Sequence, residues 1–392
     1  MLPPSLAGCV PGVFSKKQLT TLCKEGWIQG SYKKIDHSSI DVTLSDEAYW
    51  MAQGSVKPFG KSYENFLNRA KGDLAKRIEI EEDGAFTLKA KNTYVFKLEQ
   101  QLGPEIRKSR KLYGQATAKS SVGRVDVLAR LIVDGMDSYE SFHPAGVEAG
   151  NGHMYLEITP ITFPVRVKPG YSLSQLRIFY GQPEDAEIQS PELYSSVLLN
   201  GGEDGCLRVD LDDVEVGGDA GCAFAAPPTD SARPISLWKD SKTERANPSD
   251  YWRLQSSSDI GGVNCLPIVK EQFYLLRSKE KISLPSSIAV YCRAIDETIG
   301  EMRIHYAGFV HPFFGRDRTD GQNGTPLIFE VRGHDVEVLL TDAEKMARLT
   351  FYRMSEESQP DDPSDYGTQT LKLSNFFAPW PRTNIEQTQK AT

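Results

Sequence analysis

Residues 155–179 read YLEITPITFPVRVKPGYSLSQLRIF, and residues 328–351 read IFEVRGHDVEVLLTDAEKMARLTF. Each stretch consists of short runs of aromatic and branched residues interrupted by Gly, Pro or Asp, a pattern typical of β-strands joined by turns. Each also begins with two apolar residues followed by a glutamate, so that Glu157 corresponds to Glu330 at an offset of 173 residues. The sequence therefore predicts one β arrangement that occurs twice.

Two further pairs of short anchors support this duplication. Residues 41–42 (DV) correspond to residues 210–211 (DL), at an offset of 169 residues. Residues 94–96 (YVF) correspond to residues 274–276 (YLL), at an offset of 180 residues. Three anchors that recur in one order at nearly constant spacing indicate an internal repeat.

The chain length and the spacing of apolar residues suggest how the repeats are organised. A length of 392 residues suits two domains of about 100–200 residues each. A segment rich in Gly, Asp and Ala covers residues 200–234, so we predict a first repeat at 1–199 and a second at 200–392. Helical spacing occurs only at 19–27 and 63–75, which favours an all-β fold with a few short helices over a doubly wound one.

Composition excludes several classes of protein. The formal net charge of −8 and the pI of about 5.5 repel polyanions, so nucleic-acid binding is not expected. Apolar runs fall well short of the roughly 20 residues of a membrane-spanning helix, and we predict a cytoplasmic protein. The six cysteines form no CxxC pair, so neither a disulfide framework nor a zinc finger is indicated.

Residues 119–124 read KSSVGR and form the first candidate site. Two hydroxyls, a glycine and two cations suit a turn that grips phosphate through backbone N–H groups, hydroxyls and positive charge. A solvated polar β-turn has the same composition, and the local sequence leaves both interpretations open. The matching stretch of the second repeat, residues 286–297 (SSIAVYCRAIDE), has no hydroxyl pair followed by Gly and Arg, so any phosphate site belongs to the first repeat.

Glu157 is the second candidate because it interrupts the apolar run MYLEI. A carboxylate inside a β core must be paired or functional, since an unpaired buried charge is costly. Glu330 has similar surroundings, so both residues could equally be structural.

Several stretches resemble a known family. Residues 114–134 (GQATAKSSVGRVDVLARLIVD) and 153–178 (HMYLEITPITFPVRVKPGYSLSQLRI) are similar to the long, duplicated form of bacterial dCTP deaminase, within the dUTPase-like superfamily. Residues 305–309 (HYAGF), 329–336 (FEVRGHDV) and the tail 366–374 (YGTQTLKLS) resemble its second repeat and closing segment. The resemblance covers roughly residues 15–380.

The resemblance implies fold, assembly and reaction together. The expected fold is two tandem dUTPase-like distorted jelly rolls (β-clip domains), and the expected assembly is a homotrimer. The expected reaction is hydrolytic deamination of dCTP to dUTP, with Mg²⁺ bound only through the substrate triphosphate. A zinc deaminase carries a His-x-Glu and a Cys-x-x-Cys motif, and this sequence has neither; we expect no zinc.

Site roles carry over to matching residues of this chain. The resemblance implies that Glu157 is the general base, that Arg124 orients it, and that Ser120 hydrogen-bonds the attacking water. The expected substrate-binding residues are Lys119, Ser121, Val122, Gly123, Tyr155, Leu156, Gln175, Tyr366 and Gln369. The last two belong to a tail that is expected to close over the first-repeat site and to become ordered only with nucleotide.

The chain departs from the family pattern at two positions. Val147 stands where many relatives have a turn aromatic, and His311 stands where an acidic residue precedes Pro. These departures leave sugar selectivity and tail docking open. The alternatives are a dUTP pyrophosphatase, a bifunctional deaminase and pyrophosphatase, and a non-catalytic nucleotide-binding protein of the same fold.

Overall fold

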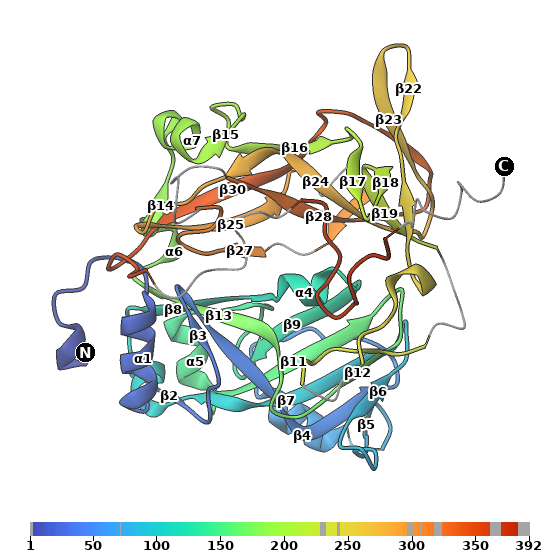
Figure 1. Cartoon of the computed structure of the whole chain (residues 1–392). Helices are drawn as coiled ribbons and strands as arrows, with labels where there is room; N and C mark the ends of the chain where they lie inside the picture. The colour runs from blue at the N-terminus through green and yellow to red at the C-terminus, as the bar shows by residue number, and fades with distance from the viewer. Residues whose placement is uncertain are drawn as a thin grey trace.

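The computed structural model describes residues 3–70, 72–227, 233–240, 244–295, 302–305, 308–316, 324–360 and 370–382, with backbone alone for 302–305. It confirms the predicted all-β fold of two tandem domains: two large curled sheets dominate, and the helices are short. Figure 1 shows the two repeats as layers, with repeat two above repeat one.

The sheet of repeat one is antiparallel throughout and follows the order β10-β8-β13-β4-β7-β11-β9. Its main strands are β4 (Ser39–Met51), β7 (Thr93–Leu102), β8 (Leu112–Ala118), β9 (Val127–Val133), β10 (Ser141–Phe142), β11 (His153–Pro160) and β13 (Ser172–Tyr180). Short strands pair at its margins: β1 (Gly12–Val13), β2 (Ile28–Gln29), β3 (Ile35–Asp36) and β5 (Ala75–Arg77).

The sheet of repeat two has the same plan, with the order β21-β19-β24-β16-β30-β25-β27. These strands are β16 (Cys206–Asp210), β19 (Ala223–Ala226), β21 (Arg253–Gln255), β24 (Phe273–Ile282), β25 (Ile288–Ala294), β27 (Gly308–Val310) and β30 (Lys345–Arg353). Strand β28 (Thr325–Gly333) pairs with β24 and with β26 (Met302–His305), while β14 (Glu187–Ile188) and β15 (Leu198–Leu199) add to the edges.

Smaller sheets complete the fold. They contain β6 (Phe86–Leu88), β12 (Val165–Val167) and β20 (Ile235–Ser236); β22 (Ser258–Ile260), β23 (Val263–Ile268) and β29 (Val338–Thr341); and β17 (Val214–Val216) with β18 (Asp219–Gly221). Strand β20 belongs to the second half of the sequence but pairs in parallel with β12 of repeat one. The two repeats are therefore joined by strand pairing as well as by packing.

Strand register confirms the internal repeat. Glu157 on β11 lies opposite Val95 on β7, and Glu330 on β28 lies opposite Leu275 on β24. The anchors at 94–96 and 274–276 therefore occupy equivalent places in the two sheets. Because side chains alternate along a strand, the two glutamates point from equivalent faces of their sheets.

Both helices predicted from spacing are present, with different ends. Helix α1 (Lys16–Lys24) begins before residue 19 because Ser15 and Gln18 form a capping box, which satisfies free N–H groups at a helix start. Helix α2 (Tyr63–Arg69) ends well before residue 75.

Further short helices had not been predicted. Four of them, α3 (Pro104–Lys108), α5 (Pro144–Ala149), α6 (Pro183–Ala186) and α7 (Pro191–Val197), start with proline, whose fixed φ suits the first helical position. Short 3₁₀ turns cover Pro4–Leu6 and Pro248–Asp250. No helix of the described residues is long and apolar enough to span a membrane.

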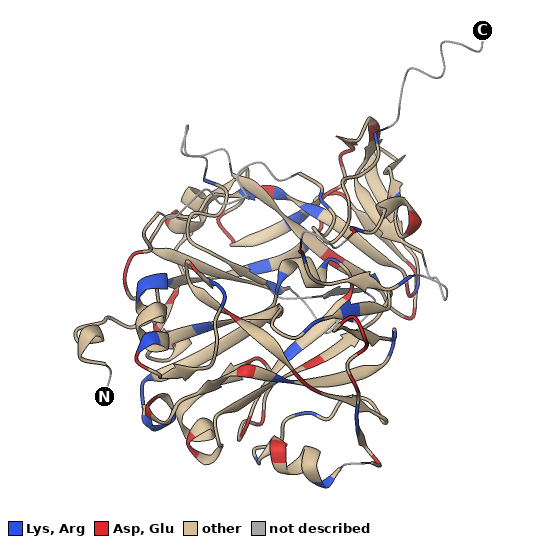
Figure 2. Ribbon diagram, turned by 60° about the horizontal axis from the view of Figure 1, so that its bottom comes forward, with Lys and Arg blue, Asp and Glu red and all other residues tan. Residues whose placement is uncertain are grey.

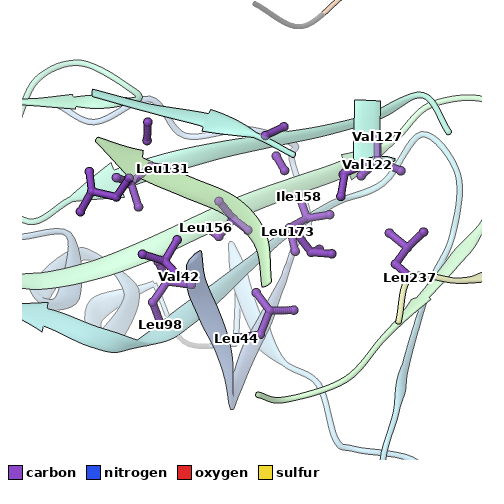
Figure 3. Packing of buried hydrophobic residues seen from close by; sticks show 14 of the residues in the cluster. Val42, Leu44, Leu98, Val122, Val127, Leu131, Leu156, Ile158, Leu173 and Leu237 are labelled. Carbon is purple, nitrogen blue, oxygen red and sulfur yellow. The ribbon is translucent and has the colours of Figure 1, made fainter. Parts of the chain in front are cut away.

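The largest hydrophobic core fills repeat one and extends across the junction. Leu156 and Ile158 of β11 point into it, close to Leu173 and Val42 (Figure 3). It also takes in buried residues from later in the chain, namely Phe224, Trp252, Phe273, Leu275, Leu371, Leu373, Phe376 and Phe377. The last four belong to the C-terminal segment, so this segment is part of the core.

Candidate functional site

The KSSVGR segment forms a one-turn helix between two strands of repeat one. It follows β8 and comprises Lys119, helix α4 (Ser120–Gly123) and Arg124, after which the chain enters β9. The Lys119 N–H donates to the Leu173 carbonyl at 2.9 Å, and Val122 is buried beside Val127 (Figure 3). Ser120 is exposed and Ser121 half-buried. The turn is therefore anchored by its apolar residue, and Ser120 is accessible to a ligand.

The carboxylate that lies against this turn comes from repeat two. A Cβ atom built on Gly123 would lie 2.5 Å from Glu330 Oε2 and 2.8 Å from Oε1. The absence of a side chain at Gly123 therefore allows Glu330 to touch the turn. Figure 1 shows the arrangement, with α4 directly below β28 at the junction.

Glu330 is 5% exposed and has an unusual electrostatic environment. Burial raises its pKa well above the ordinary carboxyl value, because desolvation disfavours the charged form. Arg124, itself buried, opposes this rise in pKa, and Asp126 adds to it. The carboxylate is thus more basic than an exposed glutamate and has a cation beside it.

A second contact between β28 and the turn lies next to Glu330. Arg332, which faces the same side of β28, donates from Nη1 to Asp126 Oδ2 at 2.7 Å. Asp126 is fully buried, and it also accepts a hydrogen bond from Thr162 Oγ1. Burial raises the pKa of Asp126 to about 6, while Arg332 opposes the rise.

Glu157 does not contact the turn. Its carboxylate is 1% exposed and accepts hydrogen bonds from Arg130 Nη2, from Tyr139 Oη at 3.0 Å and from Ser55 Oγ at 3.1 Å. The arginine that binds Glu157 is thus Arg130, where the resemblance implied Arg124, and the charge of Arg124 acts on Glu330.

The difference arises from what covers the same face in each repeat. Tyr155, like Glu157, faces away from the main core of repeat one and packs against Tyr63 of α2. Leu156 points the other way, into the core. In repeat one this outer face is thus covered by helix α2 of the same repeat. In repeat two the equivalent face, which carries Glu330, meets α4 of the other repeat.

A polar network continues from the turn along β4 and β13. Lys119 Nζ lies 2.6 Å from Asp41 Oδ2. Gln175, the neighbour of Asp41 across the two strands, accepts from Ser39 Oγ at 3.1 Å and lies 3.0 Å from His311 Nε2. Burial lowers the pKa of His311 to about 4. Lys119 follows β8 and Gln175 lies on the neighbouring strand β13, and His311 of repeat two contacts Gln175.

The C-terminal segment reaches the same turn. Ser374 Oγ donates to the Ser121 carbonyl at 2.6 Å. Tyr366 and Gln369, the residues expected to close the site, lie outside the described residues. Leu371, Leu373, Phe376 and Phe377 of this segment are buried in the core, so this part of the C-terminal segment is packed into the fold.

The equivalent turn of repeat two follows β25. Ala118 lies opposite Ser174, and Ala294 lies opposite Ala347, so the counterpart of KSSVGR begins at Ile295 and reads IDETIG. The expected match at 286–297 is therefore out of register, since Ser286 and Ser287 precede β25. Residues 296–300, including Asp296 and Glu297, lie outside the described residues, but their sequence contains no cation.

Sequence reasoning did not assign a role in the site to Glu330, Asp126 or Arg332. Glu330 had been recognised only as the twin of Glu157, and no local signal distinguishes the two. Val147, one of the two expected departures from the family pattern, is buried in the core on α5. Among the described residues, no group of three or more His, Cys, Asp or Glu is placed to hold a metal ion.

Comparisons with known proteins agree with this architecture. The family model of the 2'-deoxycytidine 5'-triphosphate deaminase N-terminal domain matches residues 10–182, and the model of its C-terminal domain matches residues 206–377. A search of curated proteins finds no match. The fold is similar to the crystal structure of 2'-deoxycytidine 5'-triphosphate deaminase from Agrobacterium tumefaciens, with a TM-score of 0.74 and 23% identity, over 89% of this chain and 99% of that one.

The two family models match in order, one on each repeat, and together cover most of the chain. The chain therefore belongs to the dCTP deaminase family, in the form in which the β domain is duplicated.

Proposed function

We propose that this protein deaminates dCTP hydrolytically to dUTP and ammonia, at a site where Glu330 of repeat two meets the Lys119–Arg124 turn of repeat one. The observation that carries the proposal is the contact between the Glu330 carboxylate and Gly123. It joins a buried base to a hydroxyl-rich, cationic turn within a single chain. Membership of the family supports the choice of substrate.

In the proposed reaction, Glu330 replaces Glu157 as general base. Its carboxylate takes a proton from water while the water oxygen adds to C4 of cytosine, and the proton then passes to N3 or to the departing ammonia. Arg124 keeps the carboxylate ionised and oriented, since a neighbouring cation favours the charged form. The exposed Ser120 hydroxyl hydrogen-bonds the water and the developing tetrahedral centre.

The triphosphate has a separate set of partners in this proposal. Lys119, the Ser121 hydroxyl and backbone N–H groups of the turn contact phosphate oxygens, and Gln175 lies further along the same network. Mg²⁺ enters as part of the substrate complex, and zinc has no role. The C-terminal segment contacts Ser121 through Ser374, and Tyr366 and Gln369 are the residues of the tail that we propose cover the bound nucleotide.

Charge and assembly complete the proposal. In Figure 2, basic and acidic residues are interspersed along the ribbon of the described residues. This mixture suits a small anionic substrate better than a nucleic acid. The assembly proposed is a homotrimer, in which each chain contains one complete turn and carboxylate pair.

Product analysis tests the proposal directly. Incubation with dCTP and Mg²⁺ should yield dUTP and ammonia, without dUMP or pyrophosphate. Release of pyrophosphate would instead show a bifunctional enzyme or a dUTP pyrophosphatase, and an unchanged substrate would leave only nucleotide binding. EDTA should reduce the activity and added Mg²⁺ should restore it. Loss of activity to a zinc-selective chelator, without rescue by Mg²⁺, would contradict the proposed chemistry.

The pH dependence of the reaction should reflect the raised pKa of Glu330. A general base works only when ionised, so kcat/KM should fall as the pH drops through the pKa of Glu330 in the folded protein. That acid limb should lie above 4.5, the ordinary value. A profile of kcat/KM against pH checks this, and an acid limb at or below 4.5 would contradict the raised pKa of Glu330.

The same raised pKa affects stability in the opposite direction. A carboxyl whose pKa is higher in the folded chain stabilises the fold fully below its unfolded pKa, and this contribution is lost as pH rises through the folded pKa. Ionised Glu330 therefore costs stability at the pH where the enzyme works, which is usual for a catalytic carboxylate.

A further inference from the structure

The ion pair between Asp126 and Arg332 crosses the junction at the proposed active site. Arg332 Nη1 lies 2.7 Å from Asp126 Oδ2, and the same nitrogen lies 2.9 Å from Thr162 Oγ1. The Arg332 side chain is 12% exposed and that of Asp126 is 0% exposed. Because both partners are withdrawn from water, separating them would leave a buried charge unpaired.

Each partner lies two residues from one half of the site. Asp126 follows Arg124 by two residues, and its N–H donates to the Gly123 carbonyl at 2.8 Å. Its φ of 56° places it in the left-handed region, where Asp and Asn are tolerated better than other residues with side chains. Arg332 follows Glu330 by two residues on the same face of β28. The ion pair thus links the end of the turn to the strand that carries the base.

The ion pair also controls the charge around Glu330. Among the side chains that the structure describes, the charged and titratable groups that act on Glu330 are Arg124 and Asp126 from the turn, and the Cys292 thiol of β25 feels its charge. In the strand register, His305 of β26 lies opposite Glu330. Asp126 is the carboxylate that raises the pKa of Glu330. Arg332 pairs with Asp126 and so balances its negative charge.

The ion pair lies at the junction and has no counterpart at the equivalent position of repeat one. The position of Arg332 corresponds to Thr159 in repeat one, at the same offset that relates the two glutamates. Thr159 Oγ1 lies 2.9 Å from Thr93 Oγ1 in its own sheet. The β architecture is therefore formed without an arginine at this place.

We propose that Asp126 and Arg332 are positioning residues, which hold Glu330 against the KSSVGR turn and balance the charge beside it. This inference rests on the proposed function, since it assigns Glu330 as the base. Neither residue needs to touch the substrate for this role.

The test is the pH profile of kcat/KM for dCTP in Asp126→Asn, Arg332→Gln and the double variant. Asparagine keeps the shape and tolerates the positive φ. Asp126→Asn removes a negative charge beside Glu330, so the acid limb should move down by about one pH unit. Arg332→Gln leaves Asp126 unbalanced, so the acid limb should move up by about the same amount. The double variant should return close to the wild-type profile.

Two further variants serve as controls. Arg332→Lys keeps the charge and should keep the wild-type acid limb. Arg208→Gln breaks another ion pair with a buried carboxylate, that of Glu280 within repeat two. It should lower stability without moving the acid limb of the kcat/KM profile.

In Arg332→Gln, kcat should fall about tenfold or more, while KM changes less than about threefold, because misplacing a base acts on the chemical step.

The outcomes separate this inference from the proposed function. Wild-type protein that leaves dCTP unchanged overturns the proposed function, and the inference with it. The inference alone is overturned if the wild type is active but Asp126→Asn and Arg332→Gln leave the acid limb of the kcat/KM profile in place. It is also overturned if both variants shift the acid limb in the same direction. If Arg332→Gln does not fold, the downward shift in Asp126→Asn decides the question.

Discussion

Replacing Glu330 by glutamine should abolish the deamination of dCTP, with a loss of at least about 10² in kcat, the lower end of general acid–base contributions. The amide keeps the size of the side chain and its hydrogen bonding but cannot accept the proton from water. Nucleotide affinity should change little, because the phosphate partners belong to the turn of repeat one. Single-turnover kinetics and calorimetric titration of the nucleotide measure the two effects separately.

Glu157→Gln is the matched control for this experiment. Glu157 and Glu330 occupy equivalent register positions, and both are buried. Glu157 is bonded to Arg130, Tyr139 and Ser55, so its replacement should lower the melting temperature and leave kcat within about threefold of wild type. The reverse result, an inactive Glu157 variant and an active Glu330 variant, would assign the base to repeat one.

Gly123→Ala tests the same contact from the side of the turn. The added methyl would overlap the Glu330 carboxylate, whose nearest oxygen is 2.5 Å from the Cβ position. Glu330 would have to move, so kcat should fall while the charge of every residue stays unchanged. Activity equal to that of wild type would show that the carboxylate does not work in the position described.

Ending the chain after Asp365 should have the largest effect on stability. This truncation removes Leu371, Leu373, Phe376 and Phe377, which are all buried in the core of repeat one and the junction. Burial of each such side chain contributes about 1.5–3 kcal/mol, and domains are typically stable by only about 5–15 kcal/mol. The truncated chain should therefore fail to unfold cooperatively in thermal denaturation followed by near-UV circular dichroism.

Two variants separate this packing role from a role in closing the site. A chain that ends after Arg382 keeps the buried segment and should melt as the full chain does. Ser374→Ala removes only the hydrogen bond to the Ser121 carbonyl, and should cost about 1 kcal/mol of stability. If the chain that ends after Asp365 melted at the wild-type temperature, the segment would be a separate lid after all.

The strands and the turn could be predicted from the sequence because both depend on residues that are close together in the chain. Alternation and turn residues placed β7, β11, β24 and β28, and the hydroxyls, glycine and cations of residues 119–124 indicated a turn that suits either phosphate binding or solvent exposure. Proline at the first position would have predicted the helices α3, α5, α6 and α7, which the spacing of apolar residues did not reveal. In each case the deciding interactions lie within a few residues of chain.

The sequence by itself determined the duplication, the all-β fold, the KSSVGR turn and the presence of two equivalent glutamates. Only the tertiary structure decided which glutamate meets the turn. Strand alternation turns Glu157 and Glu330 toward equivalent faces, but what covers a face depends on packing between segments far apart in the chain. Loop residues near Ser55 and helix α2 cover the face of Glu157, whereas the junction places α4 over Glu330, where Gly123 leaves space for a carboxylate.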